Sequence, residues 1–147
     1  MPHGQLGKKL GAEQELSTLT DAVEEADCDS ALLLDARDPR RLYMWLASCP
    51  SGPSAMFHVL NIHTVAELKL ERQRAAGART LLVFDRQFEE SVERKVMKAL
   101  MTRIFAVPVQ GSRERHPKVQ HTMYFSWLDD RIWVRIYRIT YDTTLKQ

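Results

Sequence analysis

The chain has 147 residues and carries 21 Lys and Arg against 19 Asp and Glu, which gives a formal net charge of +2 at pH 7. This length suits one domain with a modest core, and hydrophobic and charged fractions of 44% and 27% are typical of a globular protein. No apolar run is long enough to span a membrane, and the N-terminus lacks the basic and then apolar pattern of a secretory signal, so no membrane partner is expected.

The charges are divided unevenly along the chain. Residues 1–75 hold eight Lys and Arg and eleven Asp and Glu, a balance of −3, whereas residues 76–147 hold thirteen and eight, a balance of +5. A basic second half is what a phosphate-contacting surface needs, although a mildly basic solvated face gives the same count. Charge alone therefore favours the solvated face over a nucleic-acid partner.

Hydrophobic periodicity predicts alternating helices and strands between a flexible lead-in of residues 1–15 and a tail of residues 142–147. In chain order we expect a helix from Leu16 past Val23, a strand over residues 31–34, a helix from Pro39 to Ser48, a strand over 56–62, a short helix after Thr64, a strand over 80–84, a helix over 88–105 and a hairpin over 121–139. Since a hairpin is antiparallel, the predicted fold class is a layered α/β domain with a mixed sheet and a C-terminal antiparallel hairpin.

Local signals support several of these elements. Pro39 suits the first turn of a helix, and Thr64 and Glu67 have the spacing of a capping box. Residues 52–55 are expected to fix a turn ahead of the following strand. The longest helix is predicted to bury one apolar stripe, formed by Val92, Val96, Ala99, Leu100 and Ile104.

The C-terminal hairpin fits a two-residue turn at Asp129-Asp130. With that turn, one face is apolar and is expected to be the core face: Met123, Phe125, Trp127, Ile132, Val134 and Ile136. The opposite face carries Thr122, Tyr124, Ser126, Arg131, Trp133, Arg135 and Tyr137. A shift of one residue would mix the two sets, so the pattern supports this register. It predicts that Phe125, Trp127 and Val134 are buried.

Arginines that alternate with Trp and Tyr on an open strand face suit single-stranded RNA, because guanidinium groups contact phosphates and aromatic rings stack on bases. The hairpin therefore contributes Arg131, Trp133, Arg135 and Tyr137 to a candidate RNA-binding site. The alternative is a covering helix, with the arginine stems packed over the rings, since both faces of a layered sheet are often covered.

The polar loop over residues 107–120 is the better candidate for phosphate contact. Arg113, Arg115, His116 and Lys118 lie where the tip of a loop is exposed, and they complete the candidate RNA-binding set. A charged loop that is only solvated is the other interpretation.

Metal-binding patterns are incomplete. His63 and Glu67 have the i, i+4 spacing of helical metal ligands, but the second histidine of a zincin pattern is missing. Cys28 and Cys49 have neither metal-binding nor disulfide spacing, and no neighbour marks either as a nucleophile. We expect two reduced thiols and no metal or other cofactor.

Catalytic motifs are also weak. Residues 52–54 lack the spacing of a phosphate-binding loop, and proline removes an amide donor from them. A hydrolase would need Ser54, His58 or Asp85 to converge on one pocket. We therefore expect a protein that is not an enzyme and has no small-molecule substrate.

Several separate motifs, in one order, resemble the Brix-domain family of ribosome biogenesis factors. They are Leu42-Tyr43-Met44-Trp45-Leu46, Gly52-Pro53-Ser54-Ala55, Asn61-Ile62-His63-Thr64, Ala66-Glu67-Leu68-Lys69, Leu82, Phe84-Asp85, Ile104-Phe105, His116-Pro117-Lys118 and the run from Leu128 to Arg135. Residues 1–3 resemble a point inside the family's domain, after its first strand and helix, and that domain continues beyond the hairpin. The resemblance implies that residues 16–141 are a partial Brix domain, similar in fold to anticodon-binding domains.

The same resemblance implies a function. It predicts a nucleolar factor that binds pre-ribosomal RNA during large (60S) subunit assembly and rRNA processing, with other assembly factors and ribosomal proteins as partners. The alternative is a protein-interaction module within the pre-ribosome that makes no direct RNA contact. Mutation of the loop arginines discriminates the two, because only the first predicts a uniform loss of RNA affinity.

Overall fold

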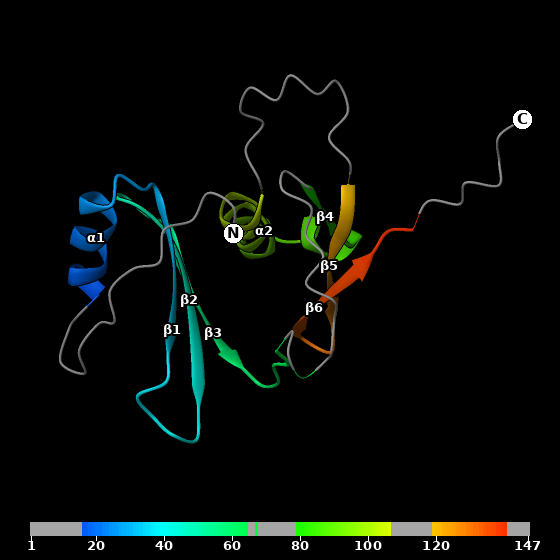
Figure 1. Cartoon of the computed structure of the whole chain (residues 1–147), viewed down its shortest axis with the longest axis horizontal. Coiled ribbons are helices and arrows are strands. Elements are labelled where there is room, and N and C mark those ends of the chain that lie inside the picture. The colour runs from blue at the N-terminus through cyan, green and yellow to red at the C-terminus, as the bar shows by residue number, and fades with distance from the viewer. Residues whose placement is uncertain (1–15, 65–66, 68–78, 107–118, 141–147) are drawn as a thin grey trace, which may run out of the picture.

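A computed structural model of the protein describes residues 16–64, 67, 79–106 and 119–140 (Figure 1). The elements in these residues are α1 (Leu16–Glu25), β1 (Ser30–Asp35), β2 (Leu42–Ser48), β3 (Ser54–Val59), β4 (Arg79–Phe84), the 3-10 helix η1 (Arg86–Glu89), α2 (Val92–Phe105), β5 (Val119–Leu128) and β6 (Arg131–Arg138). The predicted lead-in, most of the helix after Thr64, the charged loop and the tail lie outside the described residues.

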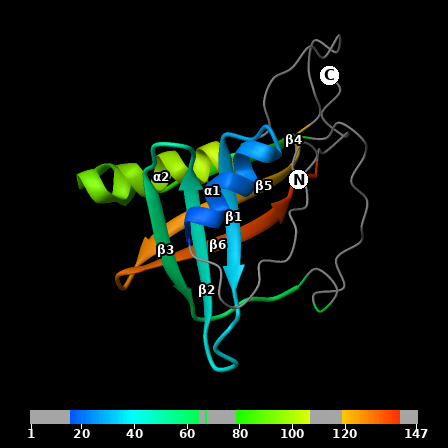
Figure 2. The same ribbon diagram turned by 90° about the vertical axis from the view of Figure 1, so that its left-hand side faces the viewer.

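The strands form two three-stranded sheets. In the first sheet, in the order β1-β2-β3, all neighbours are antiparallel. In the second, in the order β4-β5-β6, β4 is parallel to β5 and β5 is antiparallel to β6. Figure 1 shows α1 outside the first sheet and α2 between the two sheets, and Figure 2 shows the first sheet face-on with α1 in front of it and α2 behind. The layered α/β class, the mixed sheet and the C-terminal hairpin are confirmed, but the strands divide between two sheets.

The predicted helix from Pro39 to Ser48 is wrong, because β2 occupies most of this segment. Pro39 lies in the turn between β1 and β2, where the Arg41 amide donates to the Asp38 carbonyl oxygen at 3.1 Å. β2 is the central strand of its sheet, its residues are all buried or half-buried, and α2 and α1 lie on opposite sides of the sheet. A strand covered on both faces reads as one apolar run, which periodicity cannot distinguish from a buried helix.

The predicted helix over residues 88–105 is shorter, since α2 begins at Val92 and η1 precedes it. The Ser91 hydroxyl caps α2 by accepting from the Arg94 amide at 3.3 Å. The apolar stripe is only partly correct: Leu100 is buried, whereas Val92 is 74% exposed and Ala99 is also exposed. Met101, outside the predicted stripe, is buried, because α2 packs on a sheet at each side rather than on one.

One core joins both sheets through α2. Its buried members are Leu46 of β2, Phe88 of η1, Leu100 and Met101 of α2, and Phe125 of β5. Partly buried side chains from both sheets pack around them, among them Met44 and Phe57 from the first sheet and Phe84 and Met123 from the second. The two sheets are therefore held by one hydrophobic cluster, and the position of the hairpin depends on it.

The turn before β3 has the constrained geometry that the sequence predicts. Gly52 has a φ of +78°, which a residue with a side chain rarely adopts. The Gly52 amide donates to the Ser48 carbonyl oxygen, and the Ser48 amide donates to the Pro53 carbonyl oxygen, each at 2.9 Å. These bonds close the turn, so that β3 begins at Ser54 and pairs with β2.

The capping box after β3 is formed. The Thr64 amide donates to Glu67 Oε2 at 2.7 Å, and the Glu67 amide donates to the Thr64 hydroxyl oxygen at 3.2 Å. The bond from the Thr64 amide lowers the pKa of the Glu67 carboxyl. The reciprocal pair is the arrangement that starts a helix, although the residues that would form its body are not described.

Candidate nucleic-acid interface

The register of the β5–β6 hairpin is the predicted one. Leu128 pairs with Arg131, Trp127 with Ile132, and Phe125 with Val134. Both turn residues, Asp129 and Asp130, have positive φ, at 52° and 55°. Two left-handed residues in succession are what a type I′ turn requires, and Asp tolerates this conformation better than most residues.

The inner face of the hairpin is only partly a core face. Phe125 is fully buried, and Trp127 and Ile132 pack on the core cluster. Val134 is 49% exposed and Ile136 50%, so the prediction that Val134 is buried is wrong. β6 is the edge strand of its sheet, and α2 packs against β4 and η1 instead of reaching across to it.

The opposite face of this sheet, here called the outer face, is formed by Leu81, Val83, Thr122, Tyr124, Ser126, Leu128, Arg131, Trp133, Arg135 and Tyr137. Arg131 and Arg135 share this face, as predicted, and both are exposed. Trp133 is 41% exposed and Tyr137 51%. Within the described residues α2 and η1 lie on the other side of the sheet, so the predicted alternative of a covering helix is not observed there.

Arg135 is held in place on the outer face. Its guanidinium carbon lies 5.2 Å from the centroid of the Trp133 ring. Its Nη1 also donates to the Ser126 hydroxyl oxygen at 3.4 Å. The contact with Ser126 crosses from β6 to β5, so the guanidinium group lies against both strands of the hairpin.

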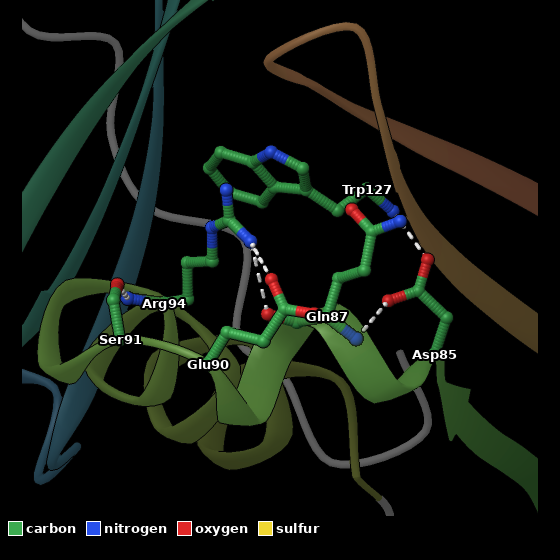
Figure 3. Close-up of polar contacts among 6 residues, drawn as sticks. All are labelled: Asp85, Gln87, Glu90, Ser91, Arg94 and Trp127. Atoms are coloured by element: carbon green, nitrogen blue, oxygen red, sulfur yellow. Dashed lines mark hydrogen bonds and ion pairs between the residues drawn. The ribbon is translucent and has the colours of Figure 1, made fainter.

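The hairpin is anchored to the rest of the domain by Asp85, at the end of β4 (Figure 3). Asp85 Oδ2 accepts from the Trp127 amide at 2.6 Å, and Oδ1 accepts from the Gln87 amide at 3.0 Å. The Asp85 amide itself donates to the Phe125 carbonyl oxygen at 3.0 Å. One residue thus caps η1 and ties β4 to two positions of β5.

The Trp127 ring has a second anchor. Figure 3 shows Arg94 of α2 reaching over it, and the guanidinium carbon lies 4.4 Å from the ring centroid. Arg94 Nη1 also donates to Glu90 Oε2 at 2.8 Å and to the Gln87 carbonyl oxygen at 3.3 Å. The sequence alone does not mark Asp85 and Arg94 as supports of the hairpin. An Asp directly after a strand predicts a helix cap, but nothing in the local sequence predicts its hydrogen bond with the Trp127 amide, 42 residues later.

The candidate site is therefore only half described. Arg131, Trp133, Arg135 and Tyr137 lie together on β6 of the outer face. The four loop residues, Arg113, Arg115, His116 and Lys118, fall in a segment that the structure does not describe, and their place relative to the hairpin stays a prediction.

The residues weighed for catalysis do not converge. Ser54 and His58 pair with Ala47 and Tyr43 on the face of the first sheet that is turned away from α2. The Asp85 carboxylate is engaged by backbone amides on the second sheet. His63 Nδ1 lies 3.9 Å from Glu67 Oε2, and no group of three potential metal ligands occurs among the described residues. In the same residues, no helix is long and apolar enough to cross a membrane.

Comparison with known proteins points to one family. A family model described as Brix domain matches residues 5–147. Ribosome biogenesis protein BRX1 of Saccharomyces cerevisiae is 36% identical over 147 residues, which are 100% of this chain and 50% of the yeast protein. The BRX1 homolog of Homo sapiens is 37% identical over 139 residues, which cover 95% of this chain and 39% of the human protein. BRX1 homolog 1 of Arabidopsis thaliana is 37% identical over 141 residues, which cover 95% and 44%.

The chain thus spans half or less of the length of these curated relatives. The match nevertheless runs through both sheets, α2 and the hairpin, and so includes every element that positions the outer face. The chain belongs to the Brix-domain family.

Proposed function

We propose that this chain is a ribosome biogenesis factor that binds pre-ribosomal RNA during large (60S) subunit assembly and rRNA processing. The proposal rests on one observation above all: a chain whose relatives are named ribosome biogenesis proteins exposes arginines and aromatic rings on one sheet face. Guanidinium groups bind phosphates and rings stack on bases, so such a face suits RNA.

The role is one of binding rather than catalysis. The partners are pre-ribosomal RNA, other large-subunit assembly factors and ribosomal proteins, and the place of action is the nucleolus. Arg113, Arg115, His116 and Lys118 supply further basic contacts from the segment that precedes β5 in the sequence. Since an assembly factor acts by holding RNA and protein in position, it needs neither a metal nor a small-molecule substrate.

A second candidate function is a protein-interaction module without RNA contact. The observation that favours it is the exposure of aliphatic side chains on the inner face of β6, where Val134 and Ile136 are half exposed. Aliphatic groups offer nothing to a phosphate or a base edge, whereas a protein partner could bury them. This candidate predicts partner binding that is indifferent to salt and to the loop arginines.

The salt dependence of RNA affinity tests the first function. Replacing Arg113 and Arg115 together with alanine is expected to flatten the plot of log affinity against log salt by about one to two units of slope, because each phosphate contact releases about one counterion. The measurement is a salt titration of RNA affinity by fluorescence anisotropy. The matched control replaces Arg40 and Arg41, two exposed arginines in the β1–β2 turn, and should leave the slope unchanged.

Two results would count against the proposal in different ways. An unchanged slope in the double variant would remove the loop from the RNA interface. The absence of salt-dependent RNA binding in the wild-type chain would favour the protein-interaction module.

A further inference from the structure

We propose that the outer face of β6 selects unpaired RNA, with one base stacked on Trp133, another on Tyr137 and the intervening backbone bound by Arg135. This inference rests on the proposed function and adds to it the class of RNA and the geometry of contact. It is carried by the exposure, spacing and composition of the outer face.

The two rings are the accessible ones on this face. Trp133 and Tyr137 are 41% and 51% exposed, whereas Tyr124 on the neighbouring strand is half-buried. They lie four positions apart along β6, which corresponds to about 13 Å in an extended strand. One base cannot span that distance, so the rings form two separate stacking positions. In an A-form duplex the bases are stacked on one another and their planes are not available, so both positions require unpaired nucleotides.

Arg135 lies between the two rings in the sequence of β6 and points to the same face. Its guanidinium group already rests near the Trp133 ring and donates to Ser126, at the distances given above. A side chain that is held before binding loses less conformational freedom when it binds a phosphate. Arg135 is therefore placed to contact the backbone that connects a base on Trp133 to a base on Tyr137.

The composition of the outer face predicts low sequence preference. The ten residues defined above include no Asp, Glu, Asn or Gln. Gln120, two positions before Thr122 on β5, alternates to the same side, but its Oε1 is buried. Without carboxylates these ten residues do not repel phosphate, and without amides they have few groups that read base edges. Ring stacking tolerates any base, because every base has an aromatic face.

The test compares unpaired and paired RNA on the 147-residue chain. Labelled 12-nucleotide oligo(U) and oligo(A) are titrated by fluorescence anisotropy beside a duplex formed from the same two strands. We expect the two single strands to bind with similar affinity and the duplex to bind more weakly. Trp133→Ala and Tyr137→Ala should each weaken single-strand binding about tenfold without changing the salt slope.

Two further variants separate stacking from folding. Trp133→Phe keeps a ring and should restore most of the affinity that Trp133→Ala loses. Val134→Ala changes a residue of the same strand on the inner face and should bind like the wild type. Circular dichroism of each variant verifies that the hairpin is intact.

The failure of this inference differs from the failure of the proposed function. Equal affinity for duplex and single strands, or ring variants that bind like the wild type, would overturn the stacking geometry while RNA binding stands. If the wild-type chain bound neither form of RNA, the proposed function would fail and this inference with it.

Discussion

Replacing Phe125 with alanine is expected to lower the free energy of unfolding by about 3–5 kcal/mol. Phe125 is fully buried on β5, and its ring stacks on Phe84 with centroids 4.5 Å apart and planes 7° from parallel. The Phe105 ring of α2 lies 6.0 Å from it. Truncation removes contacts to a sheet and a helix at once, and the surrounding side chains cannot fill the space without moving α2.

Val134 provides a matched control, because it pairs directly with Phe125 across the hairpin and points to the same face. Being 49% exposed, it buries much less surface, so Val134→Ala is expected to cost less than about 1 kcal/mol. Urea denaturation followed by circular dichroism measures both values. Similar losses for the two variants would mean that β6 is covered in solution, contrary to the exposure described here.

The hairpin was the most predictable part of the fold. Its alternating residues define the two faces, and a two-residue turn fixes the register, so the local sequence is sufficient to predict both the faces and the register. Residues 42–48 were the least predictable part, because a run of apolar residues has the same appearance in a buried strand and in a buried helix. Only the pairing of β2 with β1 and β3, which joins distant segments, decides between them.

The candidate site also has a part that the sequence predicts and a part that it does not. Alternation along β6 predicts that Arg131, Trp133, Arg135 and Tyr137 share a face, and they do. Alternation does not reveal which side of a sheet a helix covers, and so it left that face open to two interpretations and wrongly predicted that Val134 is buried. Burial depends on how far α2 extends over the sheet, which is a property of the tertiary packing.

Asp85 is expected to have the second large effect on stability. Asp85→Ala should lower the free energy of unfolding by about 2–4 kcal/mol, because it removes the cap of η1 and leaves the half-buried Trp127 amide without its acceptor. Asp85→Asn keeps one acceptor oxygen and should lose about half as much. Asp38 is the matched control. Its Oδ1 also accepts a hydrogen bond from the amide two residues later, that of Arg40, at 2.9 Å, but Asp38 is exposed and this bond does not connect to a distant strand.

The effect of Asp85→Ala should reach the outer face. Trp127 lies one position before the end of β5 and directly follows Ser126. The Ser126 hydroxyl oxygen accepts a hydrogen bond from Arg135 of the outer face. Release of the Trp127 amide loosens β5 at that point, so we expect faster hydrogen exchange at Trp127 and Ser126 and weaker RNA binding, with unchanged exchange in β1 and β2. If Asp85→Ala instead behaved like Asp38→Ala in stability and exchange, strand pairing and the Trp127–Arg94 contact would suffice to hold the hairpin, and Asp85 would only cap η1.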